Sequence, residues 1–501
     1  MAEVAPYPDL IQAAFVSDLC QLLVACNIAW AAVDHPFWQH LFATWLPAVI
    51  LPSHQVLAGR ILEQEAQRVV VDMKARVKGR FATSQSDGWK NIVRTSLVAS
   101  MINVEYSPYL LNAVDISSQP KNAENLLEIV KAEIKYCVEV LKTKIVAWCM
   151  DSSGESVKMR RLLHNLFLWI VVVACWAHQL NLVVSDYIKL KLPFMAVFDC
   201  TVEVIKWFNN HSQALRMLKE ETKARLGKAY ALVMSVITRW TTHYLSCRRL
   251  LLLETPMRTL AVSANEVLVL CGEIRLKRSG KQRKLYELCY LPISGMNCTS
   301  IVQCHLQPLA IAVNTTQANN ARLDTILLTL GHLYHLFSDP AYEAEQTDQD
   351  IFILAVVLNP YLRTKCFCQD NAAVTEALLS AMLEWCYKRM LSMNADIYLF
   401  QSFTNYLHYL GKFSEDHMAL EKHHQLTQNA ETDVNLVTIW RQLDMGGLNG
   451  RNGLVALAMH ILSIVLNSAA TERIFSAMGI VHSDIRNRLD AERVCHTVLL
   501  K

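Results

Sequence analysis

The order of predicted strands and helices between residues 79 and 184 is the feature that most constrains the fold. Three short strand candidates come first and are separated by turn residues, at 80–89, 96–104 and 109–116. A helix is predicted at 124–141 and a buried strand at 144–150, and a further helix leads to an apolar strand around 169–174. This alternation predicts a mixed sheet covered by helices, which is an α/β fold.

The segments on both sides of this region have helical patterns. Residues 8–45 carry apolar side chains at helical spacing, and residues 54–78 are predicted to form one long amphipathic helix. We expect four segments along the chain: an N-terminal helical region at 1–78, the first part of the core at 79–184, an all-helical insertion at 185–453, and the last core helix with the C-terminal region at 454–501.

The composition is that of a globular protein. The 501 residues are 52% hydrophobic and 19% charged, which predicts a large core and little disorder. The 48 basic and 45 acidic residues nearly cancel, so a surface for nucleic acid would have to be a local patch. The 15 cysteines are scattered, which favours buried thiols in a reducing compartment. The longest apolar run, 166–177, is shorter than the roughly 18 residues of a membrane span.

Two aspartates lie where predicted strands end. Asp87, in Ser-Asp-Gly-Trp, is expected at the end of the first strand, but Asp-Gly is also a common turn dipeptide. Asp151 comes directly after the apolar run 145–150, at the strand edge where α/β proteins bind ligands. The alternative for Asp151 is a helix N-cap, because a helix is predicted to begin near Glu155.

A third acidic residue, Glu472, lies near the C-terminus. Asn467 or Ser468 is a good N-cap for a helix that carries Glu472 in its first turns, where the helix dipole favours a carboxylate. The apolar residues at helical spacing on one face are Ala469, Ala470, Ile474, Phe475 and Met478. Periodicity alone therefore predicts a charge at the start of a core-bound helix.

The exact residues of this segment indicate a function more specifically than its periodicity does. Ser-Ala-Ala-Thr-Glu-Arg-Ile-Phe-Ser at 468–476, followed by Gly479 and by Arg-Asn-Arg-Leu at 486–489, closely resembles the C-terminal signature of the hAT superfamily of DNA transposases. The Asp-Gly-Trp at 87–89 is also typical of that family, whereas Asp-Ser-Ser at 151–153 departs mildly from its usual Asp-Asn-Ala. The resemblance is strong at 80–182, 238–244 and 454–489, and weak between 245 and 450.

The resemblance implies a fold and a chemistry. It implies an RNase-H-like mixed-sheet core that the helical insertion interrupts, which would explain the long separation of Asp151 and Glu472. These two residues and Asp87 would form a catalytic triad that binds Mg²⁺ or Mn²⁺ and cleaves DNA, because hard cations take oxygen ligands. The C-terminal region would then form a homodimer or a higher homo-oligomer, in a nuclear protein with no membrane segment.

Three further residues are implicated in DNA binding by the same resemblance. His178, in Cys-Trp-Ala-His, would lie beside the active site, and Arg239 and Trp240 match a motif whose tryptophan stacks near an unpaired base. From the residues alone, a hydrogen-bonded histidine at a strand end and a core tryptophan beside a capping arginine are the simpler interpretations.

Two differences from the family pattern suggest more than one function. The family usually has a zinc-binding BED finger before this region, and we expect that finger to be lost or to lie outside these residues, and the C-terminal dimerisation region to be truncated. The first hypothesis is a transposase or a transposase-derived DNA-cleaving protein. The second is a domesticated or relict protein that keeps dimerisation and nucleic-acid binding but no catalysis, and the third is a helical scaffold without a DNA role.

Overall fold

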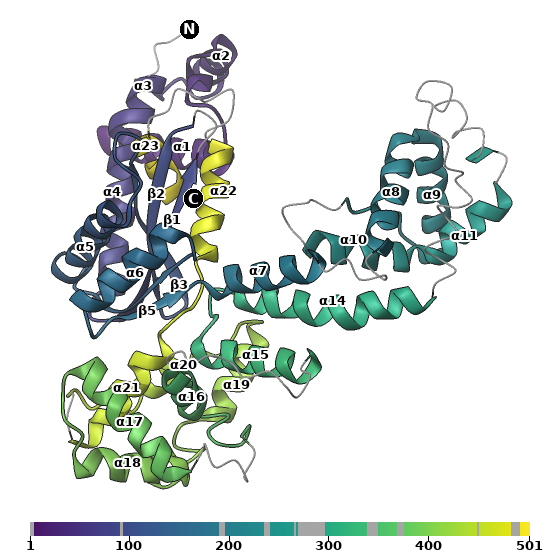
Figure 1. Cartoon of the computed structure of the whole chain (residues 1–501). Coiled ribbons are helices and arrows are strands. Elements are labelled where there is room, and N and C mark those ends of the chain that lie inside the picture. The colour runs from purple at the N-terminus through teal and green to yellow at the C-terminus, as the bar shows by residue number, and fades with distance from the viewer. Residues whose placement is uncertain are drawn as a thin grey trace. The chain divides into compact units, whose positions relative to one another are not determined.

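The computed structural model has an α/β fold, as predicted, with a mixed sheet and many helices (Figure 1). It describes residues 5–90, 94–189, 196–234, 241–264, 267–268, 296–337, 349–367, 375–447, 450–481 and 491–501. The chain forms two compact units. Unit 1 comprises Met1–His178, Thr316–Leu328 and Tyr342–Lys501, and unit 2 comprises Gln179–Thr315 and Thr329–Ala341.

Unit 1 contains a five-stranded sheet with the order β3-β2-β1-β4-β5. The strands are β1 (Phe81–Lys90), β2 (Ser96–Val104), β3 (Ser107–Asp115), β4 (Lys144–Met150) and β5 (Val171–Ala174). The first three are antiparallel neighbours, β4 runs parallel to β1, and β5 runs parallel to β4. The sheet is therefore mixed, and its topology agrees with the predicted RNase-H-like core.

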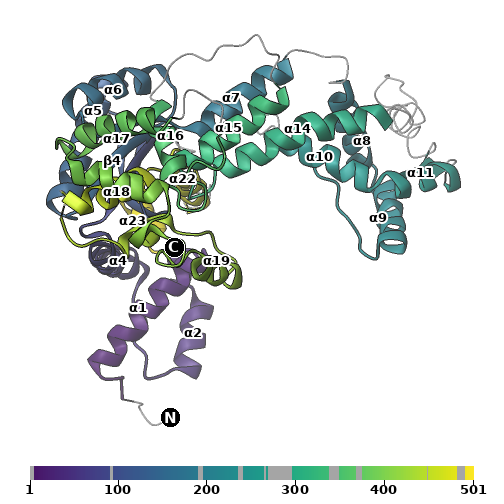
Figure 2. The same ribbon diagram turned by 90° about the horizontal axis from the view of Figure 1, so that it is seen from below.

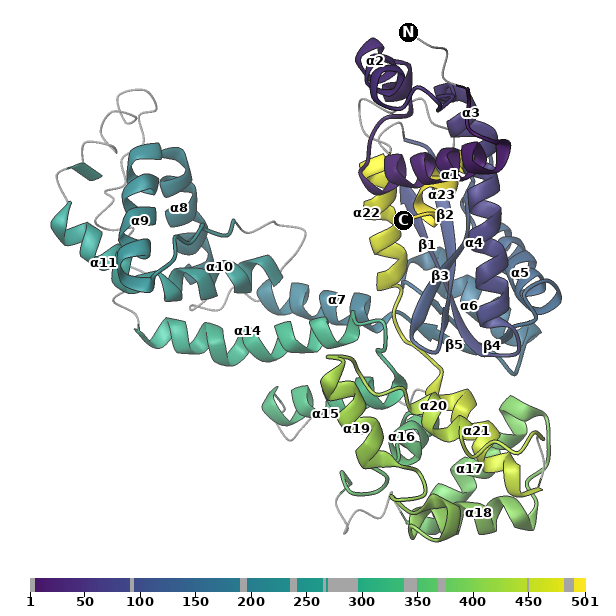
Figure 3. The same ribbon diagram turned by 180° about the vertical axis from the view of Figure 1, so that it is seen from behind.

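Helices cover both faces of this sheet because its strands carry apolar side chains on both sides. One core contains residues of α5 (Ala123–Glu139) and α6 (Gly154–Leu166), packed on strand residues such as Ile102 and Trp148. The opposite core joins Ala99 and Met101 to α22 (Ala469–Val481) and α23 (Ala491–Leu499). Figure 3 shows α22 and α23, drawn in yellow, on the side of the sheet away from α5 and α6.

The N-terminal helices precede the sheet and share a core with the end of the chain. They are α1 (Asp9–Ala25), η1 (Trp30–Asp34), α2 (Pro36–Trp45), α3 (His54–Val56), η2 (Leu57–Ile61) and α4 (Leu62–Val77). Leu500 packs against their apolar cluster. The prediction of one continuous helix over 54–78 was wrong, because Gly59 has non-helical backbone angles (φ −106°, ψ −105°) and interrupts it. Glycine pays the largest entropy cost in a helix, which makes it the natural place for the break.

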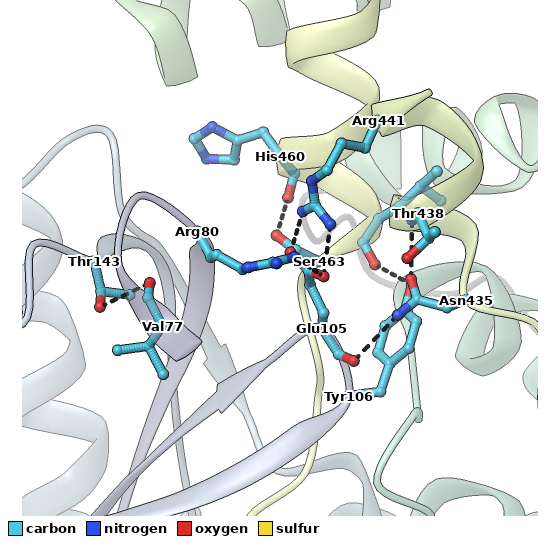
Figure 4. Close-up of polar contacts among 11 residues, drawn as sticks. Val77, Arg80, Glu105, Tyr106, Thr143, Asn435, Thr438, Arg441, His460 and Ser463 are labelled. Carbon is cyan, nitrogen blue, oxygen red and sulfur yellow. Dashed lines mark hydrogen bonds and ion pairs between the residues drawn. The ribbon is translucent and has the colours of Figure 1, made fainter. Parts of the chain in front are cut away.

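Further helices complete unit 1. They are α16 (Gln349–Leu358), α17 (Glu376–Leu391), α18 (Ile397–Leu407), η5 (Gly411–Phe413), α19 (Leu420–Asn429), α20 (Leu436–Arg441), η6 (Gly450–Asn452) and α21 (Gly453–Leu462). Every residue of α21 is buried. The turn between β2 and β3 contacts this group: Tyr106 donates a hydrogen bond of 2.9 Å from its hydroxyl to the carbonyl oxygen of Leu462, and Glu105 pairs with Arg441 (Figure 4).

Unit 2 is helical in the part of it that the structure describes. The helices that lie in it or run into it are α7 (Trp176–Lys189), α8 (Ala196–Asn210), α9 (Ser212–Leu226), α10 (Thr241–Leu252), α11 (Glu254–Ser263), α14 (Met296–Thr316) and α15 (Leu323–Phe337). Figure 2 shows α8, α9 and α11 grouped together, and Val204, Phe208 and Leu218 belong to their common core. Across the described residues of the chain, no helix is both long enough and apolar enough to span a membrane.

Candidate active site

Asp87 lies within β1, at the point where one side of the strand becomes unpaired. On one side Asp87 is paired with Ala99 of β2, and this pairing continues to Lys90. On the other side, the pairing with β4 ends at Gln85, opposite Cys149. The interpretation of Asp-Gly as a turn was therefore wrong, because the antiparallel pairing carries the strand through both residues. The edge of β1 from Asp87 onwards is open on the side of β4.

Asp151 directly follows β4, next to this open edge. The N-cap of α6 is Ser153, whose hydroxyl accepts a hydrogen bond of 3.3 Å from the backbone N–H of Ser156. The capping alternative for Asp151 was thus wrong. Its carboxylate instead accepts hydrogen bonds from the backbone N–H (3.3 Å) and the hydroxyl (3.1 Å) of Ser153. These contacts orient a half-buried carboxylate at the tip of the strand.

Glu472 lies in the first turn of α22 and is exposed. The Asn467 side chain accepts a hydrogen bond of 3.1 Å from the backbone N–H of Ala469 at the start of this helix. Phe475 is buried below the helix and stacks on Trp89 of β1, with ring centroids 5.7 Å apart. The predicted apolar face is confirmed, because Ala469, Ala470, Phe475 and Met478 are buried and Ile474 is partly buried. This packing holds the first turn of α22 against β1.

The charges of Asp151 and Glu472 both act on the carboxyl group of Asp87. Burial is the largest cause that raises the pKa of Asp87 to about 7. The charges of Asp151 and Glu472 contribute to this rise, and the hydrogen bond from the backbone N–H of Gly88, at 2.7 Å, opposes it. Residues from distant parts of the sequence therefore lie near enough to the Asp87 carboxyl group for their charges to affect its pKa.

A pocket of about 380 Å³ opens beside Asp87 and Asp151. It is bordered by the end of β1, the loop between β3 and α5, and the first turns of α5 and α6. Lys90 and Lys121 also line it, together with Trp89. The sequence pattern did not single out the two lysines, because isolated basic residues near turns carry no signal of their own.

The donor chemistry of the carboxylates suits a hard divalent cation, which prefers oxygen ligands. Among the described residues, however, no three His, Cys, Asp or Glu side chains lie close enough to hold one metal ion. Asp87 and Asp151 share the pocket, whereas Glu472 reaches Asp87 through its charge. The three residues offer the oxygen ligands that a divalent cation prefers. In this conformation they do not lie close enough together to coordinate one ion.

Two buried thiols lie beside the carboxylates. Cys149 of β4 and Cys175, which follows β5, form a hydrogen bond, and the backbone N–H of Ser468 donates to the sulfur of Cys175 at 3.4 Å. The bond from Cys149 is the largest of the causes that lower the pKa of the Cys175 thiol to about 6, and burial opposes it. The thiols thereby connect β4 and β5 to the segment that leads into Glu472.

The predicted DNA-binding residues are only partly described. His178 is half-buried in the first turn of α7, and its backbone N–H donates a hydrogen bond to Cys175. This places its main chain beside the thiol pair. Arg239 and Trp240 lie outside the described residues, as does the Arg-Asn-Arg-Leu of the C-terminal signature at 486–489.

Two family models match the parts of the chain that carry these residues. A family model described as a domain of unknown function (DUF659) matches residues 52–217, which include the five strands with Asp87 and Asp151. A second model, described as the hAT family C-terminal dimerisation region, matches residues 416–501, which include Glu472. A search of curated proteins finds no match. The first match contains a sheet of the expected topology, and with both matches the chain is an hAT-family transposase-like protein.

Proposed function

We propose that this protein cleaves DNA in a metal-dependent reaction, with Asp87, Asp151 and Glu472 as the catalytic carboxylates. The observation that carries the proposal is that Asp87 and Asp151 line one pocket at the open edge of β1, while Phe475 and Trp89 hold α22, which carries Glu472, against that strand. Burial and the repulsion of Asp151 and Glu472 raise the pKa of Asp87, and a strongly perturbed group beside a pocket is typical of a functional site. A bound cation would offset this repulsion.

The chain's own residues have distinct tasks in this proposal. Asp87 and Asp151 would hold Mg²⁺ or Mn²⁺ at the open edge of β1, and Ser153 keeps Asp151 in position through its two hydrogen bonds. Glu472 would complete the site from α22, which Phe475 anchors on Trp89. When bound, divalent cations in such sites activate the attacking oxygen and stabilise the leaving oxygen of a phosphodiester.

Nicking of supercoiled plasmid DNA in Mg²⁺ or Mn²⁺ tests the proposal. We expect Asp87→Asn, Asp151→Asn and Glu472→Gln each to lower the nicking rate at least about 100-fold, the order of loss found when one charge-stabilising group is removed from an active site. Asp72→Asn is the matched control, since Asp72 is exposed on α4 and does not line the pocket. Metal-dependent nicking that survives Asp151→Asn would refute the proposal.

A second candidate is a transposase-derived protein that no longer cleaves DNA. The incomplete set of metal ligands among the described residues favours it. It predicts that the wild-type protein does not nick DNA in either metal but still binds DNA and self-associates. The match to the hAT dimerisation region supports self-association under both proposals.

The remaining partners follow from the same assignment. We propose that DNA contacts His178, Arg239 and Trp240, and that the protein acts in the nucleus as a homodimer or a higher homo-oligomer. Sedimentation of the full chain with and without DNA would measure its oligomeric state in each case.

A further inference from the structure

The pocket beside Asp87 and Asp151 is built for a ligand that is both charged and apolar. Its volume of about 380 Å³ lies in the range of small-ligand sites, roughly 300–1,000 Å³. Three acidic residues line it, Asp87, Asp151 and Glu155, and two basic ones do, Lys90 and Lys121. A purely apolar ligand would remove water from these charged groups without replacing it, which disfavours its binding. A simple anion would leave the apolar residues of the pocket in contact with water.

The two lysines come from different elements. Lys90 ends β1 and Lys121 lies just before α5, and both are exposed. Neither forms an ion pair with another described residue. Two ammonium groups at the border of one pocket supply the point charges that bind a phosphate. The acidic residues, by contrast, exclude a ligand that carries negative charge throughout.

The apolar part of the pocket lies between these charges and the core. Leu97 is buried, and Leu126 and Ile129 on α5 are half-buried. A nucleobase has two apolar faces, and its edges form hydrogen bonds. The side-chain amide of Gln119, which also lines the pocket, supplies both a donor and an acceptor for such an edge.

We propose that this pocket binds one unpaired nucleotide of the DNA strand, with its phosphate on Lys90 and Lys121 and its base against Leu126 and Ile129. The open edge of β1 provides the entrance, because β4 leaves that edge after Gln85. A base inside the duplex is stacked on its neighbours and cannot contact Leu126 and Ile129, so the nucleotide enters only when it has left the duplex. The inference rests on the proposed DNA-cleaving function for its biological meaning but not for its test.

Ligand-observed NMR in the absence of divalent cations measures the binding of thymidine 5′-monophosphate to the full chain and so tests whether the pocket binds a nucleotide. Thymidine and inorganic phosphate are the comparison probes. We expect the monophosphate to bind at least about tenfold more tightly than either part. Lys90→Gln/Lys121→Gln should reduce its affinity to that of thymidine, and Ile129→Thr should reduce it to that of phosphate.

The matched control is Lys78→Gln/Lys135→Gln, which removes the same charge from exposed lysines outside the pocket and should leave the affinity unchanged. Thermal unfolding of each variant checks that it is folded. Equal affinity for monophosphate and phosphate, or no effect of the Lys90 and Lys121 changes, would overturn the proposal. Nicking that survives Asp151→Asn would refute the proposed function alone, because the nucleotide assay contains no metal and measures no cleavage.

Discussion

Glu105, in the two-residue turn between β2 and β3, accepts a hydrogen bond of 2.7 Å from Arg441 at the end of α20 (Figure 4). The same carboxylate accepts a bond of 2.7 Å from Arg80, which precedes β1. Glu105 and Tyr106 both have positive φ, 50° and 72°, a conformation that favours glycine or asparagine in such turns. Contacts with residues far along the chain therefore hold a turn that its own sequence disfavours.

Glu105→Gln should destabilise unit 1 by about 2 kcal/mol, the order of a lost hydrogen bond between charged groups. The Glu105 side chain is only 10% exposed, whereas Arg441 and Arg80 are 33% and 41% exposed, so water still reaches both guanidinium groups when their counter-charge is removed. Urea unfolding followed by circular dichroism measures the change. Glu128→Gln is the control, because Glu128 is 69% exposed and its pair with Lys131 should contribute less than about 1 kcal/mol. Equal effects of the two changes would contradict the prediction.

His460→Leu should stabilise the protein at acidic pH. Burial and then the charge of Lys144 lower the pKa of His460 to about 3, and neither ring nitrogen forms a hydrogen bond with a described residue. The unfolded chain binds this proton near pH 6.5 and the folded chain does not, so the wild type loses stability as pH falls below 6.5. At pH 5 the wild type should have lost about 2 kcal/mol that the variant keeps. A stability difference that is independent of pH would contradict this assignment.

Glu133→Gln should remove a loss of stability that occurs as pH rises, whereas His460 causes a loss of stability as pH falls. Burial raises the pKa of Glu133 on α5 to about 7, and a hydrogen bond with Asn112 opposes the shift. The folded chain keeps this proton between pH 4.5 and 7 while the unfolded chain releases it, so wild-type stability falls as pH rises through that window. The variant should lack this loss, which amounts to about 3 kcal/mol. Denaturation midpoints of both proteins at pH 5 and pH 8 measure the difference.

Gly453→Ala should destabilise the protein by about 1–3 kcal/mol, the usual cost of overpacking. A Cβ atom at Gly453 would meet the hydroxyl oxygen of Tyr387 at 2.8 Å, and Tyr387 is buried. Gly331→Ala is the matched control on α15, because nothing lies within 4 Å of its added Cβ. That control should stabilise its helix by about 0.5–1 kcal/mol. Thermal unfolding compares the two, and a neutral Gly453→Ala would show that Tyr387 moves freely.

Local patterns were sufficient for the strands and helices of the core. Apolar segments with turn residues between them predicted all five strands, and helical spacing predicted α5 and the buried face of α22. The wrong alternatives concerned residues whose local structure depends on pairing with another strand or on a neighbouring side chain. β2 extends β1 through Asp87 and Gly88, and Ser153 caps α6 in place of Asp151. A pattern read along the chain has no information on the partner across the sheet.

The sequence by itself determined the family, the α/β class and the candidate carboxylates, because each depends on residue types at short spacing. Only the tertiary structure decided that Glu472 acts on Asp87, since this requires the packing of Phe475 on Trp89. It also decided that Lys90 and Lys121 border the same pocket as Asp87 and Asp151. Burial, charge and pocket shape at this site come from segments hundreds of residues apart, and the interactions among them exist only once the chain has folded.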